Sequence, residues 1–282
     1  MHRGSSEAFE ALVTIEKRGF ERSAREAIER ILEETLPDAA KLVMASDPVY
    51  PEELAALEEH PAVLVCEGDV SLMDRQLRVA IVGSRAASEE AKADAFQVSK
   101  ALAERGAVIG SGLGLGIDTA AHEGALAAQD TTGVRGRTVA VIGTPLAQPW
   151  PPGNVKLARR IAAYGLLISL APQVSGLSFK DEERLHSHWC RNRAIAALAC
   201  GSLVMAGKEG ASTLREVADS LTLGRPVLLW HTLVNAPNPE PWALALLADP
   251  PKDEMGRPLV RVVKSADEVE EALSPWTTVW WL

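Results

Sequence analysis

Glycine-rich turns carry the residues of this sequence that are best suited to chemistry. Four such turns each follow an apolar run of strand length and precede a helical pattern, at residues 82–85, 111–118, 142–145 and 207–213. In a parallel α/β sheet the carboxyl ends of the strands lie along one edge, so these turns should meet there with free helix N–H groups pointing outward. We therefore expect that edge to bind phosphate.

The first turn combines three residues that suit an anion. Gly83 ends a strand and permits a tight turn, Ser84 offers a hydroxyl, and Arg85 offers a forked cation. An ordinary strand-to-helix turn with a solvated arginine is the alternative interpretation of this short triplet.

The second turn gives the stronger signal. Ser111 precedes three glycines at alternate positions, Gly112, Gly114 and Gly116, and a helical pattern begins directly after them. Such a loop presents backbone amides with no side chains in the way, but its spacing differs from the dinucleotide fingerprint G-x-G-x-x-G, which disfavours a Rossmann dehydrogenase. Asp118 lies in the first helical turn, where a capping role is favoured over that of a base.

A third cluster contains two arginines and an amide. Arg191, Asn192 and Arg193 precede the apolar run 194–199, so we expect them at the start of a helix. Guanidinium groups at that end oppose the helix dipole, which indicates an anion between them. Solvated surface arginines are the alternative.

Local helix signals explain other polar residues near these turns. Asn154 ends the Pro-stiffened turn 150–154 and is a natural N-cap, although a plain loop fits equally well. Ser212 or Thr213 should cap the helix that follows, and Glu216 lies three residues after Thr213, as in a capping box.

We find no catalytic set in the sequence. His186, His188 and Cys190 lack a second ligand pair at zinc-like spacing, and no Ser/His/Asp or Cys/His set has the context of a nucleophile. We therefore expect no metal, no cofactor and no catalytic residue.

Composition limits the kind of partner. The 282 residues are 47% hydrophobic and 24% charged, with a formal net charge of −9. That balance does not suit a broad basic face along nucleic acid, so any anion site must be local. No run approaches the roughly 18 apolar residues of a membrane span, and three widely spaced cysteines suit a reducing compartment. We expect a cytoplasmic protein without a membrane partner.

The chain divides into three parts by its pattern. Residues 1–46 predict a small helical unit, and residues 47–232 alternate strands and helices, beginning with an edge strand at 62–66. Nearly continuous apolar strands separated by helices predict an α/β fold with a doubly wound, mostly parallel sheet. Residues 233–282 form an extension with a Pro-rich stretch, a short strand, an acidic helix and the tryptophans 276, 280 and 281, which should pack the tail onto the body or a second subunit.

From about Asp47 to Trp230 the sequence resembles the DNA-processing protein A family, also called DprA or Smf. The resemblance depends on motifs that follow in the family's order: Tyr50-Pro51, His60 to Leu64, Val79 to Arg85, Ser111 to His122, Pro151 to Asn154, Arg191 to Arg193 and the Gly-Ala-Ser-Thr-Leu run from Gly210.

This resemblance implies an extended Rossmann-like fold that binds single-stranded DNA, forms a homodimer and passes the strand to the RecA recombinase during natural transformation. It implies phosphate contacts from Arg85, Arg191 and Arg193 or Asn192, with close backbone approach at Gly112 and Gly116. Lys208 would replace a basic residue of the last turn. The full set of residues that we expect to bind DNA or phosphate is Gly83, Ser84, Arg85, Ser111, Gly112, Gly114, Gly116, Asn154, Arg191, Asn192, Arg193, Lys208, Gly210, Ser212 and Thr213.

Three departures from the family pattern leave a second hypothesis open. Gly114-Leu115 stand where the family usually has Ala-Arg, the family's C-terminal winged helix is not evident, and the chain is acidic. The run from Gly210 to Glu216 partly echoes the G-x-G-T-x-x-E motif of the "Lonely guy" phosphoribohydrolases. In that hypothesis Arg191 or Arg193 holds a 5′-phosphate and Glu216 assists cleavage of the base–ribose bond. A non-catalytic nucleotide sensor is the third possibility.

Overall fold

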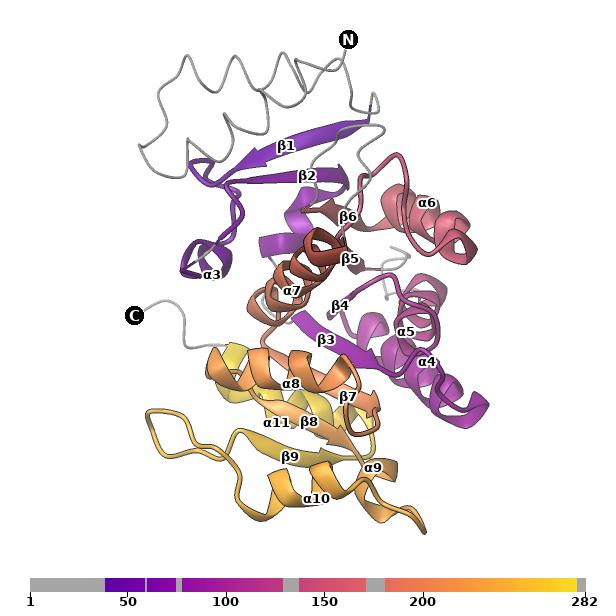
Figure 1. The fold of residues 1–282 in the computed structure, drawn as a ribbon, viewed down its shortest axis with the longest axis vertical. Helices are drawn as coiled ribbons and strands as arrows, with labels where there is room; N and C mark the ends of the chain where they lie inside the picture. Colours follow the sequence, from indigo (N-terminus) through magenta and orange to yellow (C-terminus); the bar gives the residue numbers. More distant parts are fainter. Residues whose placement is uncertain (1–38, 59, 75–77, 129–136, 171–180, 278–282) are drawn as a thin grey trace.

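A single sheet runs through the part of the chain that the computed structural model describes, which is residues 39–58, 60–74, 78–128, 137–170 and 181–277 (Figure 1). Its strands lie in the order β1-β2-β6-β5-β4-β3-β7-β8-β9. Neighbours from β6 to β9 pair in parallel, whereas β2 is antiparallel to both β1 and β6. The strands are β1 (Ala40–Met44), β2 (Val63–Gly68), β3 (Arg78–Gly83), β4 (Val108–Ser111), β5 (Thr138–Ile142), β6 (Leu166–Ser169), β7 (Gly201–Ala206), β8 (Val227–Trp230) and β9 (Val260–Val263).

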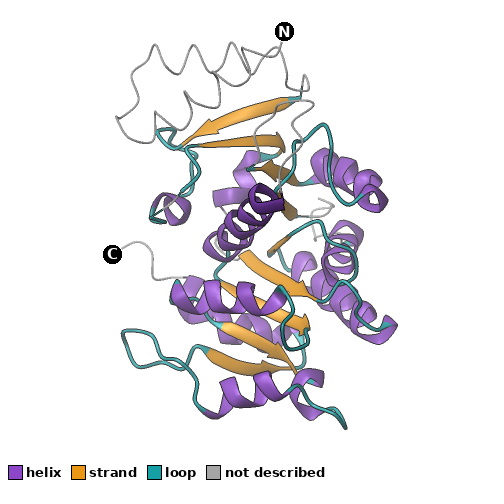
Figure 2. Ribbon diagram, in the orientation of Figure 1, coloured by secondary structure: helices purple, strands orange, loops and turns teal. Residues whose placement is uncertain are grey.

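Helices cover both faces of this sheet, as Figure 2 shows. Alternate residues of β3 face opposite layers: Ala80 and Val82 belong to the core under α7, and Val79 and Ile81 to the core under α4 and α5. One layer contains α3 (Glu52–Ala55), η1 (Val70–Asp74), α7 (Asp181–Leu198), α8 (Thr213–Thr222), α9 (Thr232–Asn235) and α10 (Pro241–Ala248). The other contains α4 (Glu89–Glu104), α5 (Ile117–Ala127), η2 (Pro152–Asn154), α6 (Val155–Tyr164) and α11 (Ala266–Thr277).

The path of the chain creates a switch point beside β3. From β3 the chain adds β4, β5 and β6 on one side, and α7 then crosses the sheet so that β7 pairs with the other side of β3. Loops diverge at such a point and leave a crevice at the carboxyl ends of the strands. The predicted α/β class and the mostly parallel sheet are confirmed, and the glycine turns after β3, β4 and β7 do meet at this edge.

The ends of the sheet differ from what the sequence predicts. The strand expected at the edge is β2, which lies one position inside, because Ala40–Met44 pairs with it as β1. The sheet therefore begins within the segment that we expected to be a helical unit; residues 1–38 of that segment lie outside the described residues. At the other end β9 pairs in parallel with β8, so the extension from residue 233 continues the sheet instead of standing apart.

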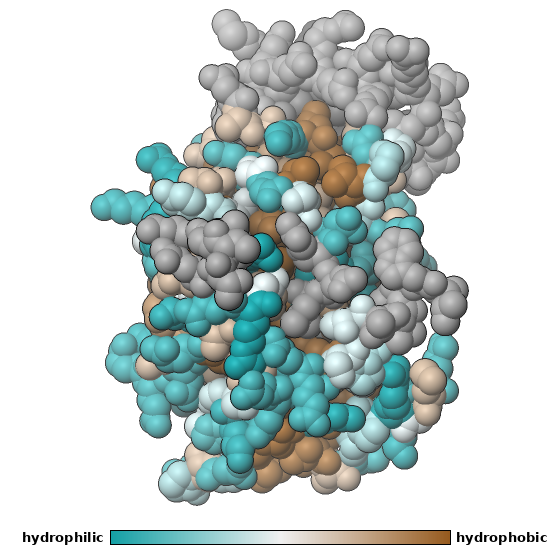
Figure 3. All heavy atoms as spheres, turned by 180° about the vertical axis from the view of Figure 1, so that it is seen from behind, coloured by the Kyte–Doolittle hydropathy of each residue, from teal (hydrophilic) through white to brown (hydrophobic). Residues whose placement is uncertain are grey.

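The C-terminal helix packs onto the body, as predicted for the tail. Trp276 is 5% exposed, and the guanidinium of Arg257 lies 4.4 Å from the centroid of its ring, within range of a cation–π contact. Trp280 and Trp281 lie outside the described residues. On the face seen from behind, hydrophilic side chains cover much of the described surface (Figure 3).

Candidate functional site

The loop between β4 and α5, residues 111–116, is the centre of the candidate site, and we call it the glycine loop. A Cβ atom built on Gly112 would lie 1.8 Å from Nη1 of Arg191, and one on Gly116 would lie 2.4 Å from the carbonyl oxygen of Ser84. Gly116 also has φ +77°, which side chains rarely adopt. Glycine is therefore required at both positions, because another chain segment occupies the space of a side chain.

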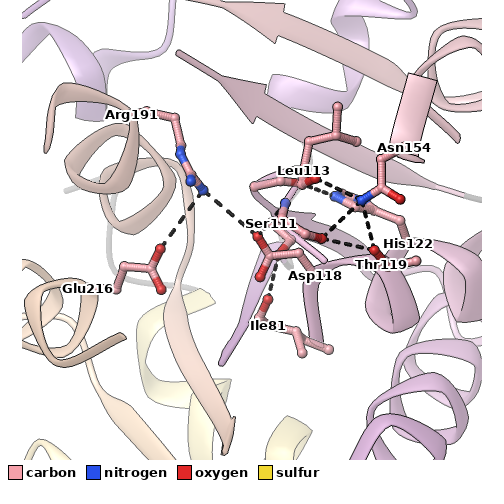
Figure 4. Close-up of polar contacts among 11 residues, drawn as sticks. Ile81, Ser111, Leu113, Asp118, Thr119, His122, Asn154, Arg191 and Glu216 are labelled. Atoms are coloured by element: carbon pink, nitrogen blue, oxygen red, sulfur yellow. Dashed lines mark hydrogen bonds and ion pairs between the residues drawn. The ribbon is translucent and has the colours of Figure 1, made fainter. Parts of the chain in front are cut away.

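Asn154 holds the glycine loop in place. Its Nδ2 donates to the carbonyl oxygens of Leu113 at 2.8 Å and Gly114 at 3.1 Å, and to Oγ1 of Thr119 at 2.8 Å (Figure 4). Thr119 in turn donates to the Gly114 carbonyl at 2.9 Å. Asn154 does occupy the N-cap position of α6, as predicted, but its side chain makes no capping hydrogen bond to that helix.

A buried histidine contacts the backbone of the glycine loop. His122 on α5 has Nε2 2.5 Å from the carbonyl oxygen of Gly112 and Nδ1 2.7 Å from Oγ1 of Thr138. Because a carbonyl oxygen only accepts, Nε2 carries the proton. Burial lowers the pKa of His122, so the neutral ring is the favoured form. The sequence motif contains His122, but only the fold reveals that it positions Gly112.

Arg191 reaches this loop from the opposite layer. It is 7% exposed, and its Nη1 lies 3.9 Å from Oδ2 of Asp118 and 4.0 Å from Oε1 of Glu216 (Figure 4). Both distances exceed that of a hydrogen bond, and Nη1 has no hydrogen-bond partner among the described residues. A buried donor without a partner is costly, so this atom is the clearest sign of a missing ligand.

Two carboxylates surround that guanidinium. Oδ2 of Asp118 accepts the N–H of Gly114 at 3.0 Å, so Asp118 fixes the glycine loop and does not act only as a cap. Burial, followed by the charge of Asp118, raises the pKa of Glu216 to about 8, although Arg191 and Arg85 act in the opposite direction. Near neutral pH the proton-bearing form of Glu216 is therefore accessible.

The helical context of Arg191 corrects the argument from the helix dipole. The helix α7 begins at Asp181, so Arg191, Asn192 and Arg193 lie well inside it and not at its start. The evidence that Arg191 binds an anion is therefore its buried Nη1, which lacks a hydrogen-bond partner among the described residues, and not the helix dipole. Asn192 is buried, and its Oδ1 has no hydrogen-bond partner among the described residues. Burial raises the pKa of Asp219 on α8, and the charge of Arg193 opposes that rise.

The turn after β3 contributes one exposed cation. Arg85 is exposed, and its Cγ would lie 3.9 Å from a Cβ on Gly114, so it flanks the glycine loop. Oγ of Ser84 accepts the N–H of Ala86 at 3.1 Å, whereas the backbone N–H of Ser84 donates to Ala206. Gly83 has no room for a side chain, because a Cβ there would lie 2.7 Å from Ile117.

The other residues predicted to bind DNA or phosphate make no hydrogen bond or ion pair with Arg191 in the part of the chain that the structure describes. Ser111 is buried and donates to the Ile81 carbonyl at 2.7 Å, which leaves only its backbone for a ligand. Lys208 and Gly210 are exposed in the turn after β7, Ser212 is exposed at the start of α8, and Thr213 is buried. The predicted capping box is wrong: Ser212 makes no side-chain capping bond, and the carboxylate of Glu216 lies beside Arg191.

Chemically, the arrangement suits an anion. The glycine loop offers backbone amides, and Arg191 and Arg85 offer guanidinium groups. The carboxyl groups of Asp118 and Glu216 lie next to the guanidinium of Arg191 and lower the net positive charge there when they are ionised. Among the described residues no group of three or more His, Cys, Asp or Glu side chains could hold a metal ion, and none of their helices is long and apolar enough to cross a bilayer.

Residues 41–241 match the model of the family described as DNA recombination-mediator protein A. This chain belongs to that family. Its curated relatives include the DNA processing protein DprA of Bacillus subtilis, 30% identical over 198 residues (70% of this chain and 63% of the relative), and that of Streptococcus pneumoniae, 36% identical over 183 residues (64% and 59%). The match thus spans less than two thirds of each of these relatives.

Solved structures of the family share the fold. DNA processing protein A of Streptococcus pneumoniae has a TM-score of 0.68 at 25% identity, over 96% of this chain and 93% of that one. The Helicobacter pylori protein, described for its single-stranded DNA binding mode, has a TM-score of 0.67 at 23% identity, over 84% of this chain and 96% of that one. The expected Rossmann-like fold is confirmed by these likenesses.

Proposed function

We propose that this protein binds single-stranded DNA at the glycine loop and takes part in DNA processing and recombination. The observation that carries the proposal is the buried Nη1 of Arg191, which lies directly behind Gly112 and has no hydrogen-bond partner among the described residues. A phosphate oxygen would supply the missing acceptor through a charge-assisted hydrogen bond. The relatives named above are DNA-processing proteins, which supports DNA as the source of that phosphate.

Exposed apolar residues beside the loop favour a nucleic acid over an isolated phosphate. Leu115 is 48% exposed, and its Cδ2 would lie 3.7 Å from a Cβ on Gly153. Trp150, three residues before Gly153, is 59% exposed. Bases of single strands stack on exposed aromatic rings without regard to sequence, so Trp150 is suited to contact a base while Arg85 and Arg191 hold the backbone.

Fluorescence anisotropy with a labelled oligothymidylate tests the proposal. Arg191→Ala and Arg85→Ala should each weaken binding about tenfold or more, because each removes a charged hydrogen-bond donor. Arg85→Ala should also reduce the slope of log affinity against log salt by about 0.7, the share of one phosphate of a single strand. Arg261→Ala, which removes an exposed arginine of β9, is the matched control and should leave binding unchanged.

Failure of both variants to change the affinity would contradict the assignment of the site.

By resemblance we extend the proposal to a cytoplasmic homodimer that delivers the bound strand to RecA and has no catalytic activity of its own. Sedimentation gives the oligomeric state. A RecA strand-exchange reaction tests delivery, which wild type should accelerate and Arg191→Ala should not.

One observation keeps the phosphoribohydrolase hypothesis testable. That hypothesis requires an arginine and Glu216 in one site, and Glu216 does lie 4.0 Å from Arg191. The family match favours DNA binding. Incubation with nucleoside 5′-monophosphates, followed by chromatography for free base, distinguishes the two, because base release that Glu216→Ala abolishes would favour the enzyme.

A further inference from the structure

The Arg191 site, by which we mean Arg191 with Asp118 and Glu216, contains more negative than positive charge. Nη1 of Arg191 is within 4.0 Å of one oxygen from each carboxylate, and the side chains of both acids are 12% exposed. With both acids ionised, an entering phosphate would meet two like charges for each guanidinium in a poorly solvated place. In that ionisation state the site therefore repels the anion that Nη1 of Arg191 would bind.

Charges from every neighbouring element act on Glu216. Asp118 on α5 and Asp219 on its own helix favour its neutral form, whereas Arg191 on α7 and Arg85 after β3 favour the carboxylate. Asp219 is itself offset by Arg193 and Arg215, and Asp118 is held by the N–H of Gly114. Within the described part of the chain the carboxylate of Glu216 has no hydrogen-bond partner, so it is the acid with least to lose on protonation.

We propose that the Arg191 site binds a phosphate only while it holds one proton, and that Glu216 carries this proton. The proposal rests on the proposed function for its ligand, which is the backbone phosphate of single-stranded DNA. A neutral Glu216 no longer repels the phosphate and can donate its own O–H to a phosphate oxygen. The pKa of Glu216, raised to about 8 by burial, is consistent with this role, and a bound anion raises it further.

Linkage fixes the direction of the pH effect. A ligand that binds only the protonated site loses affinity once pH exceeds the pKa of the free site, by about tenfold per pH unit for one proton. Binding should therefore be nearly constant below about pH 7.5 and should fall above about pH 8. Because thymine itself loses a proton in alkali, the probe is a short oligodeoxyadenylate, at constant ionic strength.

The decisive variant is Glu216→Gln, which is neutral at every pH and keeps an N–H donor. We expect it to bind at about pH 9 as tightly as at pH 7, while wild type weakens about tenfold over the last pH unit. Asp219→Asn is the matched control: it removes a carboxylate one turn further along α8 but leaves Glu216 in place. It should still lose affinity as pH rises, with the fall beginning at somewhat lower pH, because the charge of Asp219 favours neutral Glu216. Coincident pH profiles for wild type and Glu216→Gln would overturn the proposal.

Sulfate separates this proposal from the assignment to DNA, because its charge is constant from about pH 6 to 9. Sulfate should raise the Tm of wild type more at pH 7 than at pH 9, and Arg191→Ala should abolish the rise. A normal sulfate response without DNA binding at any pH would refute the proposed function and leave the proton coupling supported. An equal rise in Tm at both pH values, or none at either, would refute the proton coupling.

Discussion

Two largely buried arginines, near opposite ends of β3, differ in how their guanidinium groups are satisfied. Arg78 begins β3 and donates to the carbonyl oxygens of Met73 and Leu198 and to the carboxylate of Glu53. Arg191 lies near the carboxyl end of the same strand, and its Nη1 donates to nothing among the described residues. Similar burial thus accompanies opposite hydrogen-bonding states.

The position of each arginine explains the difference. Arg78 and Arg225 donate to the carbonyl oxygens of Leu198 and Ala197, so both cations satisfy the C-terminal end of α7, where the helix dipole favours them. Arg191 instead faces a loop whose glycines leave space and whose amides are donors like itself. We infer that the amino-terminal end of the sheet is built for stability and the carboxyl-terminal end for a ligand.

Removal of Arg78 should have the largest effect on stability. Arg78→Ala would leave Glu53 and two backbone carbonyls without their donor in a mostly buried place, so we expect the free energy of unfolding to fall by about 3 kcal/mol. Urea denaturation measures this loss. Arg191→Ala should cost clearly less, and an equal cost for both variants would erase the distinction between a structural and a functional arginine.

The second prediction concerns the pH dependence of stability. Since folding raises the pKa of Glu216 from 4.5 to about 8, the folded state holds the proton more tightly, and this stabilisation is present at low pH and lost as pH rises through about 8. The side chain of Glu216 is 12% exposed, and water there screens part of this effect. We therefore expect the free energy of unfolding to fall on the order of 2 kcal/mol as pH rises.

Urea midpoints at several pH values, for wild type and Glu216→Gln, test this prediction. The variant should lack that part of the decline between about pH 5 and 8, because it has no proton to lose. His122 titrates in both proteins and cancels in the comparison. Parallel stability profiles would show that Glu216 has an ordinary pKa.

The sequence predicts the surroundings of Arg78, at the amino-terminal end of β3, less well than the glycine turns at the carboxyl-terminal end of the strands. Glycine after an apolar run is a local signal, so the meeting of the turns after β3, β4 and β7 follows from the parallel topology alone. Arg78 gives no such signal, because its partners Met73 and Leu198 are backbone carbonyls that any sequence could supply. Its role depends entirely on the path of the chain.

Misassigned residues at the ligand end share one physical cause. Asn154 and Glu216 occupy positions where a local helix cap is the simplest interpretation, yet each side chain faces a segment distant in sequence. Arg191 meets Asp118 although the two are 73 positions apart in the sequence, a contact that no periodicity encodes. Capping and long-range contacts use the same residue types, so only the fold decides between them. The strand β9 was predicted, but its pairing with β8 and the existence of β1 were not, because pairing depends on the neighbouring strand.

A smaller effect is expected from the residue that holds the glycine loop. Asn154→Ala removes the amide donor for two carbonyls and Oγ1 of Thr119, so we expect a loss of about 1–2 kcal/mol in the free energy of unfolding. Thermal unfolding measures the loss, and DNA affinity should fall with it because the loop amides lose their alignment. Asn154→Asp, which is similar in size but places an acceptor against those carbonyls, should be no better than alanine. Recovery by aspartate would mean that shape, and not hydrogen bonding, fixes the loop.

The smallest expected effect comes from a methyl group added at Gly110 in β4, and the same methyl added at Gly112 in the loop after it provides the contrast. Gly110 lies beside a small cavity bounded by Val108, Val139 and Ile195, and a Cβ there would approach no atom closer than 3.9 Å. Gly110→Ala should therefore raise the free energy of unfolding by about 0.5–1 kcal/mol, since it restricts the unfolded chain and fills space, while DNA binding stays unchanged. Gly112→Ala places the same methyl against the guanidinium of Arg191 and should abolish binding. If both variants bind DNA like wild type, then the position of Arg191 next to Gly112 is not required for binding. The carboxyl-terminal ends of the strands would then differ from the amino-terminal ends in hydrogen bonding but not in DNA binding.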